Sequence, residues 1–279
     1  MINMVRESSF EEEEQDDKYL KKLNPHLDNL VRENIDKRRI RKTDDSKKFS
    51  VIESVFDERT IFQLEKLIKQ GLIERILGII SSGKEANVYL AYNQKGEEIA
   101  IKIYKIDRNT SRWMMNYIRG DPRFKKIPRN ISKIIYLWAS KEYKNLKRAY
   151  KVDLNVPKPI HVRNNILIME YIGFGSIPAP KLKNISNPKD LSALSAKILK
   201  FIKKLYQDAD LVHGDLSEFN ILYHNQQPVI IDISQAVSTQ HPKAEVFLVR
   251  DIKNVYQYFE NFDINLPSAE KFYYEIIDI

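Results

Sequence analysis

The stretch His213-Gly214-Asp215-Leu216-Ser217-Glu218-Phe219-Asn220 decides the fold, together with Ile230-Ile231-Asp232-Ile233-Ser234 downstream of it. Asp215 and Asn220 lie five positions apart in a segment that we expect to be a loop, before the short apolar run Ile221-Leu222-Tyr223. Asp232 comes twelve positions after Asn220, at the end of a second short apolar run. Two carboxylates and an amide are therefore predicted beside two short strands.

These three side chains have the chemistry of a metal-assisted phosphoryl-transfer site. Mg²⁺ prefers hard oxygen ligands and usually takes only one or two from the protein, so Asn220 and Asp232 are candidate ligands. Asp215 is the candidate base that orients an attacking hydroxyl and accepts its proton. The spacing Asp-x-x-x-x-Asn is that of a kinase catalytic loop. That spacing alone is common by chance, so it needs support from elsewhere in the chain.

Lys102 lies inside the apolar run Ile99-Ala100-Ile101-Lys102-Ile103. On the local pattern alone, its side chain is expected on the solvent face of a strand. If it faces a cleft instead, it needs an anionic partner, because burying an unpaired ammonium is strongly disfavoured. Phosphate oxygens and the carboxylate of Glu142, the only acidic residue between Asp121 and Asp153, would meet that need. The competing interpretation of Glu142 is a surface pair within a helix, worth about 0.3–0.5 kcal/mol.

The segment Ser81-Ser82-Gly83-Lys84-Glu85-Ala86 precedes an alternating, strand-like run. Its glycine, hydroxyls and lysine can offer backbone N–H groups and positive charge to phosphates. With Gly78 it nearly matches G-x-x-x-x-G-K-[ST], but Glu85 stands where the hydroxyl belongs, and a P-loop must open a helix. A P-loop is therefore disfavoured, and an ordinary turn remains the alternative to a phosphate-binding loop.

The periodicity of apolar residues predicts an α+β chain, strand-rich in its first half and helical in its second. A ligand crevice is expected between the two halves. Residues 105–129 have no clean period and contain two prolines, so they are predicted to be a long basic loop, and 173–188 to be a linker. Helices are predicted within 49–77, ending at Gly71, and over 131–151 and 189–210; strands are predicted around 86–90, 99–103, 166–169, 221–223 and 229–231.

The formal net charge of +8 is unevenly distributed. Residues 1–50 hold 12 Lys/Arg and 12 Asp/Glu with few large apolar side chains, so most of this arm is expected to be disordered or weakly helical. Residues 105–151 hold 14 Lys/Arg against three Asp/Glu. This stretch is either a solvated helix face with a mobile loop or a surface for a phosphate-rich partner such as RNA, and charge alone does not separate the two.

Composition excludes several classes of protein. With no cysteine, the chain has no disulfide scaffold, Cys-ligated zinc site, iron–sulfur cluster or thiol catalysis. No apolar run approaches the ~20 residues of a membrane span, and the N-terminus has no apolar stretch of signal-peptide length. We therefore expect a cytoplasmic protein without membrane contact. The histidines share no ligand spacing, His213 is expected to be structural, and Asp251 is expected either to brace the catalytic loop or to form a surface salt bridge.

Six segments, in this order, resemble the atypical RIO protein kinases, and their wording is closest to the type-one subfamily. They are SSGKEANVY (81–89), IAIKIY (99–104), WASKE (138–142), MEYIG (169–173), LVHGDLSEFNILY (211–223) and IIDISQ (230–235). The resemblance covers Ile73 to Phe262. A type-two member would be expected to carry a winged-helix domain before the kinase domain and a differently worded metal segment.

The resemblance implies a two-lobed, protein-kinase-like α+β fold. It divides the chain into an arm (1–48), an N-lobe (49–172) and a helical C-lobe (173–279), with 105–129 as a flexible loop. The Gly-rich loop is reduced to one glycine, and Ile-Ser replaces Phe-Gly after Asp232. No Ala-Pro-Glu segment follows, and 47 residues remain after Asp232. We therefore expect a truncated C-lobe that lacks an activation segment and peptide-docking helices.

The resemblance also assigns roles to site residues and cofactors. The cofactors it implies are ATP and Mg²⁺, with Mn²⁺ as a substitute. Carried over by position, the loop over the phosphates contains Ser82 and Lys84; Lys102 holds the α/β-phosphates and pairs with Glu142; backbone groups of Glu170 and Ile172 bond the adenine; Asp215 is the catalytic base; Asn220 and Asp232 bind the metal.

The function implied is ATP-dependent phosphoryl transfer by a serine/threonine protein kinase, an ATPase, or both, in late maturation of the small ribosomal subunit. In the family, Asp232 is also expected to accept the phosphoryl group as an aspartyl-phosphate. The implied partners are the pre-small ribosomal subunit and its RNA. The alternative from another class is a catalytically silent scaffold that binds RNA or a pre-ribosome through residues 105–151.

Overall fold

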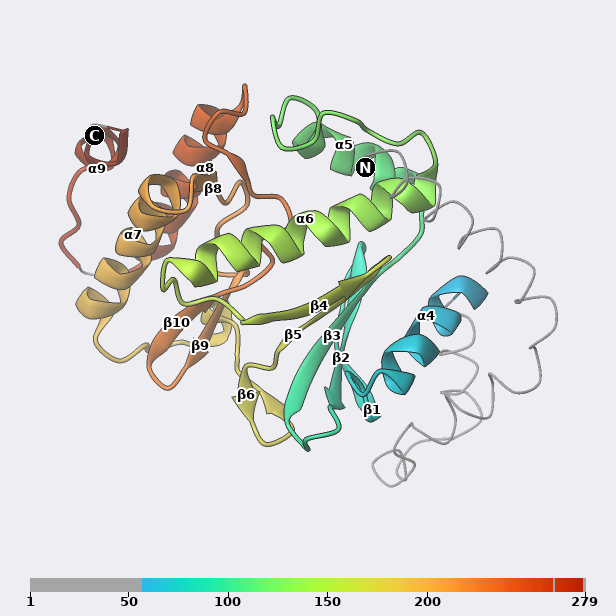
Figure 1. Cartoon of the computed structure of the whole chain (residues 1–279). Helices are drawn as coiled ribbons and strands as arrows, with labels where there is room; N and C mark the ends of the chain where they lie inside the picture. Colours follow the sequence, from blue (N-terminus) through green and yellow to red (C-terminus); the bar gives the residue numbers. More distant parts are fainter. Residues whose placement is uncertain (1–56, 263, 278–279) are drawn as a thin grey trace. The chain divides into compact units, whose positions relative to one another are not determined.

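The computed structural model describes residues 57–262 and 264–277 (Figure 1). The predicted arm, 1–48, lies outside these residues. The order of elements gives the predicted α+β class. The elements are α4 (Glu58–Lys69), β1 (Arg75–Ser82), β2 (Ala86–Tyr92), β3 (Glu98–Tyr104), α5 (Arg108–Ile118), α6 (Ile131–Lys151), β4 (Pro159–Arg163), β5 (Ile166–Glu170), β6 (Gly173–Phe174), β7 (Ile177–Pro178), η1 (Leu182–Asn184), α7 (Leu191–Gln207), β8 (Leu211–Val212), β9 (Ile221–His224), β10 (Gln227–Ile230), β11 (Val237–Ser238), α8 (Ala244–Phe259) and α9 (Ala269–Ile277).

The largest sheet has the strand order β1-β2-β3-β5-β4. Its antiparallel β3–β5 pair sets Lys102 opposite Leu167 and Ala100 opposite Met169. Because side chains alternate along a strand, Ala100 and Lys102 face the same side of the sheet. β4 pairs with the other edge of β5 and was not predicted, since its sequence Pro159-Ile-His-Val-Arg163 contains only two large apolar residues.

The described chain divides into two compact units, one holding residues 57–79 and 89–98 and the other 80–88 and 99–277. In the first, the Asp57 side chain accepts a hydrogen bond from Thr60 N (2.7 Å) and caps α4. Gly71, with φ of +74°, follows the helix in the left-handed conformation that favours glycine, as predicted. In the turn between β2 and β3, Asn93 Oδ1 accepts from the amides of Lys95 and Glu97. The lobe boundaries after residues 48 and 172 stay predictions.

In the second unit, α6 is the central helix and begins and ends at the predicted residues. Asn130 caps it by accepting from Lys133 N (3.2 Å). On α6, Ile134, Trp138 and Leu146 are buried, whereas Leu137 and Tyr143 are partly buried. The helix lies across β4 and β5 (Figure 1), so it covers the sheet that carries Lys102.

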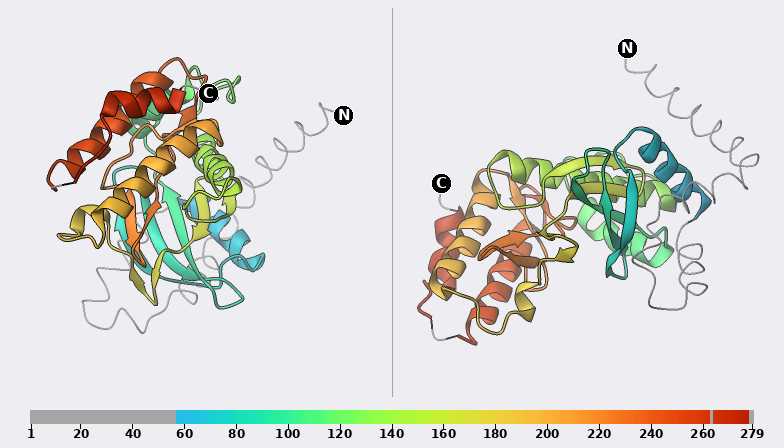
Figure 2. Two further views of the ribbon diagram at one scale, coloured as in Figure 1. Left: turned by 90° about the vertical axis from the view of Figure 1, so that its left-hand side faces the viewer. Right: turned by 90° about the horizontal axis from the view of Figure 1, so that it is seen from below.

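Four other elements of this unit lie where the sequence predicted them. α7, β5, β9 and β10 lie where helix or strand was expected. The predicted linker 173–188 contains the two-residue strands β6 and β7 and the short helix η1. Figure 2 shows α9 lying beside α7 and α8, and together they bury Phe259, Phe272 and Ile276. This helical layer supports the short strands that carry the polar loops.

The predicted loop over 105–129 is wrong for its first half, because 108–118 form α5. Asp107 caps this helix by accepting from Thr110 N (2.8 Å). Met114 and Ile118, one turn apart, are both 0% exposed and make an apolar stripe. The two prolines come after the helix and do not interrupt it. The exposed face is basic and polar, and this composition concealed the helical period.

Because α5 packs against α6, truncating the buried Met114 on α5 should destabilise the protein. Trp113 and Trp138 have ring centroids 5.7 Å apart, so the two helices are packed together. Met114→Ala should lower the free energy of unfolding by about 2–5 kcal/mol, because it leaves a cavity in this contact. The exposed Asn116→Ala on the same helix should change it by less than about 0.5 kcal/mol. Urea denaturation measures both, and equally small effects would contradict the packing.

Candidate active site

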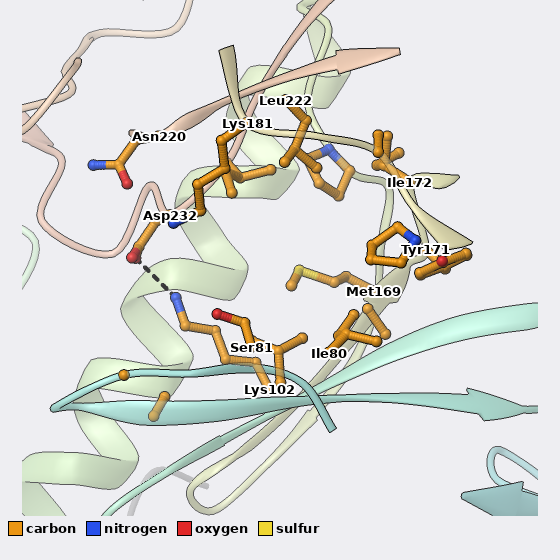
Figure 3. A pocket seen from close by; sticks show the side chains of 18 of the residues that line it. Ile80, Ser81, Lys102, Met169, Tyr171, Ile172, Lys181, Asn220, Leu222 and Asp232 are labelled. Carbon is orange, nitrogen blue, oxygen red and sulfur yellow. Dashed lines mark hydrogen bonds and ion pairs between the residues drawn. The ribbon is translucent and has the colours of Figure 1, made fainter. Parts of the chain in front are cut away.

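A pocket of about 550 Å³ lies in the second unit (Figure 3). It is bordered by the turn after β1, by strands β3 and β5, and by the residues just before β9 and just after β10. Its walls include Ala100, Met169 and Leu222. Seven of the predicted site residues line it, whereas Glu142 and Asp215 are linked to it through other residues. The seven are Ser82, Lys84, Lys102, Glu170, Ile172, Asn220 and Asp232.

Lys102 links β3, α6 and the segment after β10 that contains Asp232. Its Nζ donates to Glu142 Oε1 (2.9 Å) and to Asp232 Oδ1 (2.8 Å), and the second contact is dashed in Figure 3. Lys102 is 6% exposed and Glu142 1%. The solvent-face interpretation of Lys102 is therefore wrong, as is the surface-pair interpretation of Glu142. Both side chains are buried because each meets an opposite charge.

The charges of this trio depend on one another. Burial alone would lower the pKa of Lys102, but the carboxylates of Asp232 and Glu142 raise it above its usual value. Burial opposes ionisation of Asp232, yet Lys102 and hydrogen bonds from Lys102 and Ser234 hold its pKa below the usual value. Burial, opposed by Lys102, raises the pKa of Glu142 to about 7. The ammonium and the Asp232 carboxylate are therefore both retained near neutral pH.

Asp232 presents one oxygen to the pocket. The hydrogen bonds that it accepts from Lys102 and from Ser234 Oγ (3.0 Å) both end on Oδ1. The side chain is 45% exposed. Oδ2 is therefore the oxygen that can meet a ligand in the pocket.

Asp215 and Asn220 are joined directly. Asn220 Nδ2 donates to the Asp215 backbone oxygen (2.8 Å) and lies 3.3 Å from its Oδ2. In Figure 3 the Asn220 amide oxygen points towards Asp232. Gln235 Nε2 also donates to Asp215 Oδ2 (2.8 Å). Burial and the charge of Asp232 raise the pKa of Asp215, although Arg250 and the amide donors oppose the change.

Helix α8 holds the backbone on both sides of Asp215. Asp251 accepts from Gly214 N (2.7 Å) and Leu216 N (2.8 Å), while Asn254 Nδ2 donates to Leu216 O (3.0 Å). Asp251 is 2% exposed. It braces the loop around Asp215, and the surface salt-bridge interpretation is wrong.

The phosphate-loop candidate is an ordered turn. Gly83 N donates to Ala86 O (3.0 Å), and Ser82 Oγ donates to Asn87 Oδ1 (2.9 Å). Lys105 Nζ donates to Gly83 O (2.7 Å) and closes the turn from outside. The turn borders the pocket, and the phosphate-binding roles of Ser82 and Lys84 stay predictions.

Sequence reasoning gave no role to three residues that help to build the site. Gln235 bonds the Asp215 carboxylate, and the Tyr104 hydroxyl donates to Glu142 Oε2. Glu85 lines the pocket, and its pKa is raised to about 7 by burial and the charge of Asp232, against the effect of Lys102. Gln235 lies in the quoted segment IIDISQ, whose spacing was the signal that could have marked it.

The donor set suits magnesium held jointly with phosphate. Among the residues that the structure describes, no group of three or more His, Cys, Asp or Glu could hold a metal by itself. Asn220 and Asp232 offer one amide oxygen and one carboxylate, and Mg²⁺ takes this few protein ligands when phosphates and water supply the rest. Within the same residues, no helix is long and apolar enough to cross a bilayer.

His213 has the structural position expected of it. It is 1% exposed, its Nδ1 accepts from Asp215 N (3.3 Å), and its Nε2 lies 3.4 Å from Ile231 O. The neutral ring satisfies both contacts, with the proton on Nε2. Burial lowers the pKa of His213 to about 4.

This burial predicts a pH-dependent stability term. As pH falls from about 6.5 to 4, the unfolded state gains a proton on His213 that the folded state does not bind, so folding weakens. The free energy of unfolding of the wild type should fall by about 3 kcal/mol more than that of His213→Gln over this range. Denaturation at pH 7 and pH 4.5 measures the difference, with His224→Gln, at a more exposed site, as control. Parallel curves for wild type and His213→Gln would refute the buried neutral ring.

Comparison with known proteins shows the family to which the chain is similar. A family model for the RIO domain matches residues 87–272. The RIO-type serine/threonine-protein kinase Rio1 of Haloferax volcanii is 40% identical over 215 residues, which are 77% of this chain and 73% of the relative. The Methanocaldococcus jannaschii protein of the same name is 40% identical over 220 residues, 78% of this chain and 75% of the relative. Human serine/threonine-protein kinase RIO1 is 38% identical over 82% of this chain, but only 41% of the relative is covered.

Solved structures resemble the fold. The Rio2 kinase of Chaetomium thermophilum has a TM-score of 0.61 and 24% identity, covering 77% of this chain and 66% of that one. Its ADP/Mg²⁺-phosphoaspartate complex has a TM-score of 0.59 at 24% identity, covering 76% and 65%. This chain thus matches slightly less than two thirds of those structures. The likeness confirms the predicted protein-kinase-like α+β fold.

Proposed function

The chain belongs to the RIO family of serine/threonine-protein kinases, with Rio1 proteins among its relatives, and on this premise we propose that it catalyses ATP- and Mg²⁺-dependent phosphoryl transfer. The observation that carries the proposal is the position of Lys102, held between Glu142 and Asp232 at the edge of the pocket. A buried ammonium with one pocket-facing carboxylate beside it is suited to a metal-bound polyphosphate.

The apolar side of the pocket would hold the adenine. Glu170 N already donates to Lys158 O (2.8 Å), and Ile172 O already accepts from Ala179 N (3.0 Å). We therefore assign the adenine contacts to the Glu170 carbonyl oxygen and the Ile172 amide. Ala100, Met169 and Leu222 provide apolar walls on which a purine ring can rest.

The polar side would hold the phosphates and align the reacting groups. Lys102 Nζ would bind the α- and β-phosphate oxygens while Glu142 holds it from behind. Asn220 and Asp232 Oδ2 would be the protein ligands of Mg²⁺, which neutralises charge on the phosphates when bound. Asp215 would orient the attacking hydroxyl and accept its proton; its raised pKa suits that role. Catalysis would then rest on positioning and charge rather than on a covalent cofactor.

Two uses of ATP fit this site. In the first, Asp215 activates a serine or threonine hydroxyl of a protein substrate. In the second, an Asp232 carboxylate oxygen attacks the γ-phosphorus, ADP leaves, and water later hydrolyses the acyl phosphate to aspartate and phosphate. Only residues 233–243 separate Asp232 from α8, which leaves little chain to support an extended peptide. This favours ATPase activity beside, or instead of, peptide phosphorylation.

Replacing Asp232 tests the proposal. Wild-type protein incubated with γ-labelled ATP and Mg²⁺ should form a protein phosphate that hydroxylamine removes, because acyl phosphates react with this nucleophile. Asp232→Asn should lose this species, and phosphate release should fall by at least about 100-fold. Asp208→Asn, an exposed change of the same kind directly after α7, should behave as wild type.

Other outcomes separate the two uses of ATP. Acid-stable phosphoserine or phosphothreonine that resists hydroxylamine, with no acyl phosphate, would leave kinase activity and reject the aspartyl route. No nucleotide binding by the wild type would reject the proposed function altogether and favour the silent scaffold.

We also propose that the pre-small ribosomal subunit and its RNA are partners, in a cytoplasmic maturation step. This rests on the family resemblance and on the exposed bases between α5 and α6. Lys125, Lys126 and Arg129 are exposed, as are Lys144 and Lys147 on α6. Because such side chains release counterions when they contact phosphates, binding should depend on salt.

Neutralising this segment tests the RNA proposal. Lys125→Ala/Lys126→Ala/Arg129→Ala should weaken RNA binding and flatten the slope of log K against log salt by about 2. Lys197→Ala/Lys200→Ala/Lys253→Ala, which removes the same charge from exposed positions on α7 and α8, is the control. Filter binding or anisotropy over a salt series measures both. Equal slopes for the two triple variants would reject this surface as the RNA-binding site. A separate variant, Lys102→Ala, should abolish nucleotide binding and leave RNA binding intact.

A further inference from the structure

Lys141, next to Glu142 on α6, is a buried lysine that the proposed reaction does not use. It is 0% exposed, and its Nζ donates to Ser234 O and Ala236 O, both at 2.6 Å. No carboxylate lies within ion-pair distance of it among the described residues. Burial, reinforced by Arg123, lowers the pKa of Lys141 well below its usual value. A side chain that is this costly to bury is held by the two carbonyl oxygens that it serves.

Two further side chains converge on the same carbonyls. Asn145, one turn along α6 and also 0% exposed, donates through Nδ2 to Ile233 O (2.8 Å) and Ala236 O (3.0 Å). Arg123 donates through Nη2 to Ala236 O (3.2 Å) and through Nη1 to Asn145 Oδ1 (2.7 Å). Arg123, Lys141 and Asn145, hereafter the carbonyl clamp, thus satisfy the backbone oxygens of residues 233, 234 and 236.

The clamped segment lies between two groups of the proposed reaction. It begins directly after Asp232, whose φ of +57° puts a non-glycine residue in the left-handed region. Such a conformation persists only where the surroundings enforce it. Within the segment, Gln235 directs its side chain to the Asp215 carboxylate. The backbone that the clamp fixes therefore determines where Asp232 Oδ2 and the hydrogen bond to Asp215 lie.

We propose that Lys141 and Asn145 are positioning residues, which hold the backbone of 233–236 so that Asp232 and Asp215 keep their working geometry. The expected effect on catalysis rests on the proposed function, whereas the expected hold on the 233–236 backbone does not. Glu142 and Lys141 are neighbours with separate tasks: the first positions Lys102, and the second positions the segment after Asp232. One helix, α6, thereby aligns both ends of the Lys102–Asp232 contact.

The first test measures local opening of the backbone without any ligand. In the full-length protein, Lys141→Met should speed amide hydrogen exchange of a peptide spanning about residues 230–238 by about tenfold or more, because the carbonyl bonds that close this segment are lost. Exchange in α7 should not change. The matched control is Ile276→Ala, which removes a fully buried side chain on α9, outside the proposed site. If Lys141→Met speeds exchange uniformly, or not at all, the clamp is rejected.

The second test separates positioning from a loss of stability. Lys141→Met should lower kcat for phosphate release and raise the Mg²⁺ concentration for half-maximal activity, each by about 10–100-fold, as for residues that orient metal ligands. The KM for ATP should change by less than about threefold, because the clamp touches no residue of the adenine side. The two variants are compared at the same distance from their melting temperatures. If Lys141→Met then has the same kcat and Mg²⁺ dependence as Ile276→Ala, Lys141 has only a structural role.

Asn145→Ala keeps the inference testable if Lys141→Met fails to fold. It removes a smaller group from the same oxygen and should move exchange and Mg²⁺ dependence in the same direction. The double variant should change kcat less than the product of the single effects, because both side chains hold Ala236 O. Independent effects would overturn the clamp. If the wild type turns over no ATP, the proposed function fails and the exchange data alone decide the clamp.

Discussion

The Lys102 ammonium, shared between Glu142 and Asp232, is the interaction on which the site depends, because it joins β3, α6 and the segment after β10. Removing one partner of such a buried pair typically costs about 3–5 kcal/mol, whereas replacing the whole pair by apolar side chains can be neutral or stabilising. Stability alone therefore does not account for the trio. What an apolar replacement could not provide is a fixed positive charge at the wall of a 550 Å³ pocket, next to a carboxylate that remains ionised.

The positions of Asp215 and Asp232 are held by contacts to the neighbouring backbone more than by contacts between the two side chains. Asp251 fixes the amides on both sides of Asp215, and the carbonyl clamp fixes the oxygens that follow Asp232. Asn220 then ties the first segment to the base itself. Backbone amides are held in the loop around Asp215, and backbone carbonyls are held in the segment after Asp232. Both loops are therefore fixed although they contain little regular structure. This leaves Asp232 Oδ2 facing the pocket, whereas the Asp215 carboxylate is held by hydrogen bonds from Asn220 and Gln235.

Much of this could be predicted from sequence, and the failures have physical causes. The bounds of α6 followed from its apolar period, because one face of the helix is buried and the other is wet. Lys102 could not be oriented because β3 is buried on both faces, so alternation carries no information about which face is the pocket. α5 was missed because its short apolar stripe lies among bases and two later prolines. The clamp was invisible because its acceptors are backbone oxygens, which have no sequence signature.

Surplus negative charge explains why this pocket suits a metal-bound nucleotide better than a bare one. The charges of Glu85, Asp215 and Asp232 act on one another; Lys102 opposes the negative charge at Glu85 and Asp232, and Arg250 opposes it at Asp215. Burial and this mutual repulsion raise the pKa of Glu85 to about 7 and that of Asp215 above its usual value. A free polyphosphate would add further negative charge to the same space. A divalent cation held by Asp232 would reverse the sign of that interaction, so the metal and the nucleotide would each strengthen the binding of the other.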